Sequence, residues 1–537
     1  MRRTLSAHSR LNEAAGDGSM RRRSRLEANL ANGRSSARRY LLYGAMIVLS
    51  LGVPAALTLR GGHPLPSNAP PGAGIDGGSS KGGGGGVHDA GGASSARPRW
   101  EGRDVQDLGP VSPLVWRGIG DGIASTPASA DDMHVVFSTD CSPYQNYQAI
   151  LLFHSAEVVG QKGRVTRVAS GCSGAEKAEL QELMGKQPER FRVHFTPDYS
   201  LDPETGERFM FYNKPNGMAH FLKNADPPVL EAVVALIDPD MILMSPLTPN
   251  VGDAEMMLWH EQDQAMGSRW VEEGAPVGQF YGLGGAWTQW RDLPEITKGL
   301  GVDSPARAVS QMEALANYPV GPPYLMHPRD WARVLDLWVA LSPKVYKGHA
   351  GILAEMYGFC IAAAHLGLRH RVAYGLMVSD SSMPDKEGWP LVDVLGTESC
   401  SPSSVDHRRS SLPPVVHYCQ MYRVGTFMWG KRHKSHHKFF SCDSDSLELP
   451  PEDYLQGPMG TVRIHPIRPR AAATVAPDYM TPAKAVRQGY ALCAVLRAMN
   501  EALDAYKARY CRPDDITGGV RRFTDLTKEQ LAEDSHA

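Results

Sequence analysis

The chain has 537 residues, of which 42% are apolar, and a formal net charge of −2 at pH 7. This charge balance gives no indication of nucleic-acid binding, because such proteins carry a basic patch or stripe. The length leaves room for one large or two closely packed folded domains beside any tails.

The first 60 residues predict a membrane anchor. Residues 1–39 hold ten arginines, no lysine and three acids, and residues 41–59 carry no charge. At ~1.5 Å per residue, a helix of that length nearly covers the roughly 30 Å of a bilayer core. The positive-inside rule keeps the basic, disordered tail (1–39) in the cytosol, so the 40–60 span predicts a single-pass type II protein of the Golgi or endoplasmic reticulum membrane. A cleaved signal peptide and an organellar transit sequence are the alternatives.

Residues 61–130 are rich in Gly, Pro, Ser and Ala. Such a segment buries too little apolar surface to offset the entropy of ordering, so we predict a disordered stalk. The folded luminal domain then spans 131–512, and 513–537 form a polar tail. All eight cysteines follow the anchor, where an oxidising lumen permits disulfides, although their spacing leaves the connectivity open. Cys360 lies in an apolar helical run and is expected to be simply buried.

The domain alternates strand-like and helix-like segments. Apolar runs at 134–138, 164–168, 191–195 and 233–237 predict strands, whereas 146–159, 218–224 and 352–366 have helical spacing. This alternation favours an α/β fold with a mostly parallel mixed sheet flanked by helices. Ligands of such sheets collect beyond the carboxyl ends of the strands.

Two acids follow the strand predicted at 233–237. Asp238 and Asp240 flank Pro239, which lacks an N–H and so ends a central strand. Carboxylate oxygens suit Mg²⁺ or Mn²⁺, and such ions take one or two protein carboxylates while substrate phosphates complete the shell. The pair therefore predicts a divalent metal on a diphosphate, and an acidic turn is the alternative.

Six blocks of residues carry a family resemblance. They are His134-Val-Val-Phe-Ser-Thr-Asp140-Cys141 with Tyr147-Gln148, Val165-Thr-Arg167, Asn213-Lys214-Pro215, Asp238-Pro-Asp240-Met241-Ile242 with Pro246, Glu355-Met356-Tyr357-Gly358, and His417-Tyr418. In this order they resemble the plant and green-algal Golgi glycosyltransferases that modify hydroxyproline-rich proteins. These are the hydroxyproline O-arabinosyltransferases and the peptidyl serine α-galactosyltransferases, and the Asp-x-Asp form looks closer to the second branch.

The resemblance implies a nucleotide-sugar fold of the GT-A type and a membrane-anchored enzyme. That enzyme would transfer galactose or arabinose from a UDP-sugar to Ser or hydroxyproline of Pro-rich secreted glycoproteins, with retention of sugar configuration. It implies Mn²⁺ or Mg²⁺ held by Asp238, Asp240 and His417, and the imidazole favours Mn²⁺. The alternatives are another acceptor on the same fold, such as a glycan or lipid, or a catalytically inactive luminal sugar- or peptide-binding protein. A histidine satisfied in the core is the alternative for His417.

Basic residues are expected to complete the diphosphate site. Lys214 precedes a proline suited to the first turn of a helix, which would place its ammonium near a phosphate or the acidic pair. Lys431 lies fourteen residues after His417, in a region where related sugar transferases often have a glycine and a lysine. A solvated surface lysine is the alternative for each.

Other polar residues are assigned to the donor and the reacting centre. The resemblance implies donor binding by Asp140 and Asn213, and contact of Asp238 with the ribose or a metal-bound water. Glu355 is the candidate catalytic residue, since a carboxylate there would bind sugar hydroxyls or stabilise an oxocarbenium-like centre. A helix N-terminal acid that complements the dipole is its alternative, and no covalent nucleophile is assigned.

Acceptor recognition is predicted from aromatic residues. Stacking on an extended, polyproline-like peptide is expected from some of Tyr144, Tyr147, Tyr281 and Trp287, with a core role as the alternative. The cluster of His433, His436 and His437 lacks zinc-site spacing, so a basic loop facing phosphate or acceptor is preferred.

Overall fold

The computed structural model describes residues 116–202, 206, 208–252, 256–258, 269–383, 385–401, 411–424, 427–451, 455, 463–464, 478–479 and 481–521. All of them belong to one compact unit, Ser95–Ala537. The predicted cytosolic tail (1–39), membrane span (40–60) and most of the stalk lie outside these residues. Within the described ranges, no helix combines the length and apolar character needed to cross a bilayer. The anchor therefore stays a prediction.

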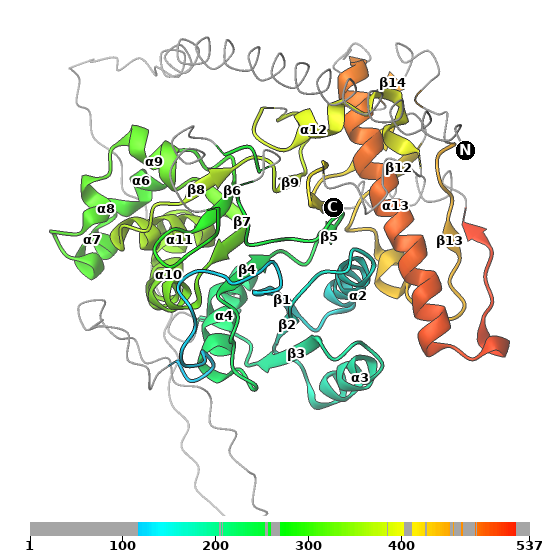
Figure 1. The fold of residues 1–537 in the computed structure, drawn as a ribbon, viewed down its shortest axis with the longest axis horizontal. Coiled ribbons are helices and arrows are strands. Elements are labelled where there is room, and N and C mark those ends of the chain that lie inside the picture. Colours follow the sequence, from blue (N-terminus) through cyan, green and yellow to red (C-terminus); the bar gives the residue numbers. More distant parts are fainter. Residues whose placement is uncertain are drawn as a thin grey trace, which may run out of the picture. The chain divides into compact units, whose positions relative to one another are not determined.

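A seven-stranded mixed sheet forms the centre of the fold (Figure 1). Its order is β3-β2-β1-β4-β7-β6-β8. The first four strands in this order run parallel, and β7 alone is antiparallel to both of its neighbours. The strands are β1 (Met133–Asp140), β2 (Val165–Ser170), β3 (Phe191–Thr196), β4 (Val233–Ile237), β6 (Val277–Phe280), β7 (Val320–Met326) and β8 (Arg371–Ala373). The predicted mixed α/β sheet is thus confirmed.

Alternating side chains explain why the central strands are buried on both faces. Val135 and Phe137 of β1 pack in one apolar cluster, whereas Val136 packs in another on the opposite face. All five residues of β4 are fully buried, as expected for a strand covered on both sides. This burial fixes the end of β4, and with it the position of Asp238.

Helices cover the two faces of the sheet (Figure 1). α4 (Asn213–Asn224), α10 (Pro328–Gly348) and α11 (Ala354–His365) pack into one cluster with one face. α2 (Pro143–Val158) packs on the other face and begins where the Ser142 hydroxyl accepts a hydrogen bond from the Gln145 N–H. The other helices are α3 (Gly174–Gly185), α6 (Trp287–Arg291), α7 (Pro294–Leu300), α8 (Pro305–Ala308), α9 (Gln311–Asn317), α12 (Trp389–Asp393) and α13 (Pro482–Tyr510).

The C-terminal region is built from short strands around the 29-residue helix α13. A three-stranded sheet of order β5-β10-β9 pairs β10 (Val415–His417) and β9 (Met377–Val378) of this region with β5 (Met241–Leu243), which follows β4. Four two-residue strands form two further two-stranded sheets. One pairs β13 (Ser446–Leu447) with β16 (Val520–Arg521), and the other pairs β14 (Arg463–Ile464) with β15 (Asp478–Tyr479). β11 (Tyr422–Val424) and β12 (Phe427–Trp429) form a further antiparallel pair.

The folded domain begins before residue 130, the predicted end of the stalk. Residues 116–130, assigned to the stalk, carry the buried Trp116, and the Gly120 N–H donates to the Val229 carbonyl at 2.8 Å. A Cβ on Gly118 would lie 2.5 Å from the Ala225 nitrogen, so this stretch packs tightly on the domain. At the other end, residues 513–521 of the predicted polar tail include the two-residue strand β16.

Three disulfides join six of the eight cysteines. Cys141–Cys172, Cys400–Cys493 and Cys442–Cys511 have Cα–Cα distances of 5.3, 5.4 and 5.7 Å. Cys360 is buried and unpaired, as predicted, and Cys419 is the second free cysteine. The second and third bridges tie α13 to the segments before it.

Candidate metal centre

Three predicted ligands meet at the carboxyl end of β4. Asp238 and Asp240 follow the strand directly, and His417 ends β10, where it pairs with Met241 of β5. The Tyr418 N–H donates to the Asp240 carbonyl at 3.0 Å. Strand pairing therefore brings a late histidine to the acids.

These three side chains are arranged as a metal site. One ligand atom from each of Asp238, Asp240 and His417 lies within 4.8 Å of the others. Among the described residues, no other cluster of His, Cys, Asp and Glu has this convergence. Asp240 and His417 are each 6% exposed, which favours charge–charge contacts inside the site. Two carboxylates and one imidazole suit Mn²⁺ or Mg²⁺.

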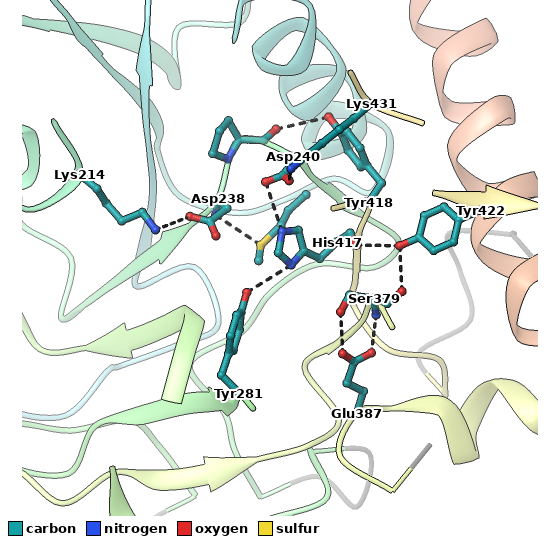
Figure 2. Close-up of polar contacts among 12 residues, drawn as sticks. Lys214, Asp238, Asp240, Tyr281, Ser379, Glu387, His417, Tyr418, Tyr422 and Lys431 are labelled. Atoms are coloured by element: carbon teal, nitrogen blue, oxygen red, sulfur yellow. Dashed lines mark hydrogen bonds and ion pairs between the residues drawn. The ribbon is translucent and has the colours of Figure 1, made fainter. Parts of the chain in front are cut away.

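Lys214 joins Asp238 to Glu355 (Figure 2 shows the contact with Asp238). Its ammonium lies 2.9 Å from Asp238 Oδ1 and 2.8 Å from Glu355 Oε1. Lys214 stands in the first turn of α4, and Glu355 stands in the first turn of α11. Burial alone would lower the pKa of Lys214, but the two acids outweigh it and raise the pKa above its usual range. This lysine is therefore cationic at neutral pH.

Glu355 has one oxygen in the ion pair and one oxygen without a partner. The residue is 1% exposed, and Oε2 is buried without a hydrogen bond. Burial raises the pKa of this carboxyl, although Lys214 opposes the shift. A buried acceptor without a donor is costly, so Oε2 is suited to accept a hydrogen bond from a ligand hydroxyl.

Asp240 has two neighbours of its own, an imidazole and an ammonium group. His417 Nε2 lies 3.3 Å from Oδ1, and the Lys431 ammonium contacts Oδ2. Burial would raise the pKa of Asp240, but these two neighbours outweigh burial and hold its pKa far below the usual value. Burial also opposes protonation of His417, yet Cys419 and Asp240 raise the pKa of the imidazole well above its usual value. The acid is thus ionised, as a metal ligand must be.

His417 is oriented from both sides (Figure 2). The Tyr281 hydroxyl lies 3.2 Å from His417 Nδ1, and the Tyr422 hydroxyl donates to the His417 carbonyl at 2.9 Å. The Ser379 carbonyl also lies 3.0 Å from the Tyr422 hydroxyl, and Glu387 accepts from the Ser379 hydroxyl at 2.6 Å. Such outer contacts fix the ring orientation of a ligating histidine. Sequence reasoning missed Tyr422, Ser379 and Glu387, because no spacing links them to His417.

Two predicted donor residues make other contacts. The Asp140 carboxylate accepts from the Ser142 N–H at 2.8 Å and from its hydroxyl at 2.6 Å. The Asn213 side-chain oxygen accepts from the Tyr199 N–H at 2.7 Å. These bonds hold the turns that follow β1 and precede α4. Neither side chain joins the acidic cluster, and donor binding by them stays a prediction.

The aromatic candidates differ in accessibility. Trp287 is fully buried, so its proposed stacking on an acceptor is wrong. Tyr147 is 2% exposed, and its hydroxyl donates to the Lys431 carbonyl at 2.5 Å. Tyr144 and Tyr281 are partly exposed. In the basic loop, His433 and His436 are buried, so only His437 of the three rings is partly open to solvent.

A mixed α/β domain with paired acids and an imidazole beyond a central strand defines a candidate metal-dependent enzyme. No family model matches the chain. It is 26% identical over 266 residues to a peptidyl serine α-galactosyltransferase of Arabidopsis thaliana, covering 47% of the chain and 28% of the relative. It is 25% identical over 370 residues to the protein of that name in Chlamydomonas reinhardtii, covering 64% and 41%.

These relatives confirm the predicted resemblance, and the chain is a homologue of glycosyltransferases. It spans well under half the length of either relative. Among solved structures, the galactosyltransferase LgtC with donor and acceptor sugar analogues has a TM-score of 0.29 at 14% identity, covering 54% of this chain and 87% of that one. The bifunctional glycosyltransferase WbbM has a TM-score of 0.29 at 10% identity, covering 56% and 47%. These TM-scores are too low to support an argument.

Proposed function

We propose that this chain is a metal-dependent glycosyltransferase of the GT-A type. Its donor is a UDP-sugar carrying galactose or arabinose, and its acceptor is Ser or hydroxyproline in an extended, Pro-rich protein. The observation that carries the proposal is the buried cluster of Asp238, Asp240 and His417, flanked by two lysine ammonium groups. The two relatives named for serine galactosylation support the choice of acceptor.

The residues near the proposed diphosphate site have two roles, metal binding and phosphate binding. Asp238, Asp240 and His417 hold the divalent cation, which supplies Lewis-acid neutralisation of the charge on the departing UDP. Lys214 and Lys431 lie on opposite sides of the acidic pair and offer ammonium groups to phosphate oxygens. A diphosphate placed here meets positive charge from the protein on two sides.

Glu355 binds the sugar or the acceptor rather than the phosphate. Its unpartnered Oε2 is placed to accept a hydrogen bond from a hydroxyl of the donor sugar or of the acceptor. Lys214 holds the other oxygen and so orients the carboxylate toward Asp238 and the cation. We retain the predicted retaining outcome as part of the proposal, without assigning a covalent nucleophile.

The proposed compartment is the Golgi or endoplasmic reticulum lumen, with the chain anchored as a type II membrane protein. Three disulfides support it, because such bonds persist in oxidising compartments and are rare in the cytosol. Confinement to the secretory lumen also suits an acceptor that is itself secreted.

Thermal unfolding of the full-length chain with UDP and Mn²⁺ tests the proposal. A ligand that binds only the folded state stabilises it by about 2.7 kcal/mol at one hundred times its dissociation constant. We expect a raised melting temperature with UDP and Mn²⁺ together, and turnover of UDP-galactose or UDP-arabinofuranose. No stabilisation by millimolar UDP with metal would overturn the proposal and favour a binding protein for another ligand.

A matched pair of variants separates the metal centre from general surface charge. Asp240→Asn is isosteric and should lower turnover by at least about a hundredfold, since removing one group that stabilises transition-state charge typically costs this much. Asp303→Asn changes an exposed acid and should leave turnover unchanged. Retained activity in Asp240→Asn would mean that the cation binds elsewhere.

A further inference from the structure

The Lys431 ammonium lies within the metal cluster itself. It contacts Asp240 Oδ2, while His417 Nε2 lies 3.3 Å from Oδ1. Both oxygens of this carboxylate therefore face positive charge or a hydrogen-bond donor. The Asp240 side chain is 8% exposed and that of Lys431 is 17% exposed, so little water screens the pair.

The backbone of Lys431 is anchored, whereas its ammonium ends a flexible stem. The Tyr147 hydroxyl of α2 donates to the Lys431 carbonyl at 2.5 Å, and the His433 N–H donates to the Gly430 carbonyl at 3.3 Å. These contacts fix the start of the side chain. The four-carbon stem has several rotatable bonds, through which the ammonium can exchange one oxygen ligand for another nearby.

Lys214 differs from Lys431 in how many acids hold it. Lys214 contacts Asp238 and Glu355, so it stays paired when Asp238 turns to another cation. Lys431 has an ion pair with Asp240, and the described residues show no second acid in contact with it. A divalent cation at Asp240 therefore meets an ammonium that lacks an alternative protein carboxylate. A diphosphate would supply that alternative.

We infer that Lys431 is an internal counter-ion that keeps metal affinity low until a diphosphate accepts its ammonium. The inference rests on the proposed function and concerns the order in which the same site fills. Like charges repel strongly in a buried site, so cation and ammonium compete for Asp240. UDP relieves the competition, and by thermodynamic reciprocity the cation raises UDP affinity by the same factor. Free Mn²⁺ is then bound weakly, and the UDP complex of the metal is favoured.

Titration of Mn²⁺ alone provides the test, with the free ion followed by electron paramagnetic resonance. The full-length chain is compared with Lys431→Met, with and without saturating UDP. We expect the variant to bind Mn²⁺ alone about tenfold more tightly, and UDP to raise its Mn²⁺ affinity about tenfold less than in the unaltered chain. Lys298→Met removes an exposed lysine on α7 and should change neither value.

The opposite results distinguish failure of the counter-ion role from failure of the proposed function. Unchanged or weaker binding of Mn²⁺ alone by Lys431→Met would overturn the counter-ion role, whereas the proposed function would stand if UDP still promotes metal binding. Lys431→Arg keeps the charge and should bind Mn²⁺ alone as weakly as the unaltered chain. Tight binding by the arginine variant would show that charge is not the cause. If the unaltered chain takes up no Mn²⁺ even with UDP, the proposed function itself fails.

Discussion

The two acids of the metal centre stand two residues apart, yet their ionic partners come from different regions of the chain. Asp238 contacts Lys214 and, through it, Glu355, which lie on helices packed against the large sheet. Asp240 contacts His417 and Lys431, which lie in the C-terminal region after the last strand of that sheet. The sheet region and the C-terminal region each supply one side of the site.

The two regions combine apolar packing and cross-links in different proportions. In the sheet region, α4, α10 and α11 share one apolar cluster with the central strands, and burial fixes the side chains that they carry. In the C-terminal region, β10, β11 and β12 have three residues each. Such short strands need further constraints, which an apolar cluster shared with the long helix α13 and two disulfides provide. The comparison teaches that His417 and Lys431 depend on packing against α13 and on two cross-links, whereas Lys214 and Glu355 depend on packing alone.

The largest expected effect comes from removing the Cys400–Cys493 bridge by alanine substitution at both positions. The bridge spans a sequence separation of 93. Its loss should cost about 4 kcal/mol of unfolding free energy, chiefly by freeing the unfolded chain. We expect amide exchange to accelerate in α13 and β10 while β1 and β4 stay protected, and Mn²⁺ binding with UDP to weaken.

The matched variant removes Cys141–Cys172 in the sheet region, where the sequence separation is 31. The shorter loop predicts a cost about 1 kcal/mol smaller, and the metal centre should keep its Mn²⁺ affinity. If both double variants lost metal binding to the same extent, the proposed difference between the regions would be wrong.

Lys214→Met should have the next largest effect. The substitution leaves Asp238 and the buried Glu355 without their shared cation, and breaking such a buried pair costs about 3 kcal/mol. Denaturant unfolding measures the loss. Adding Glu355→Gln should restore part of the stability, because the uncompensated buried charge disappears. A double variant no more stable than Lys214→Met alone would show that Glu355 carries no buried charge once Lys214 is lost.

The sequence predicts the sheet region well because its strands are buried on both faces. Runs at 134–138 and 233–237 correspond to Met133–Asp140 and Val233–Ile237, since continuous apolar runs mark strands of this kind. The position of Asp238 follows from the end of the strand. The position of Glu355, the second acid that contacts Lys214, cannot be predicted in this way. The contact between Lys214 and Glu355 spans 141 positions and depends on helix packing.

The C-terminal region is less predictable for a physical reason. Its strands are too short to show periodicity, and the hydrogen bonds of His417 with Tyr422 and Tyr281 arise only in the folded chain. The prediction of His417 rests on the family resemblance, with only the short apolar pair Val415-Val416 before it as a local signal. The stalk boundary failed for a related reason, since a lone Trp116 among glycines and prolines has no periodic partner, yet it is buried in the domain.

The smallest expected effect is a loss of stability at low pH, caused in each region by a different buried histidine. His370, beside α11, and His436, in the C-terminal region, are both buried, and burial lowers the pKa of each to about 3. In the unfolded chain a histidine titrates near 6.5. The unfolded state thus binds more protons, so stability is fully present above pH 6.5 and is lost as pH falls toward 3. Each residue should cost about 2 kcal/mol at pH 5 relative to pH 8.

Phenylalanine substitution removes the titrating group and keeps an aromatic ring. His370→Phe should preserve protection of α11 at pH 5, where the ring packs 5.5 Å from Phe359. His436→Phe should preserve protection near β12, where the ring stacks 5.3 Å from Trp429. His349→Phe, at a partly exposed position, is the control and should change neither. Because each region has an apolar cluster of its own, each variant should protect only its own region from acid. Equal protection of both regions at pH 5 by either variant would mean that they unfold as one cooperative unit. The two sides of the metal centre would then fold and unfold together.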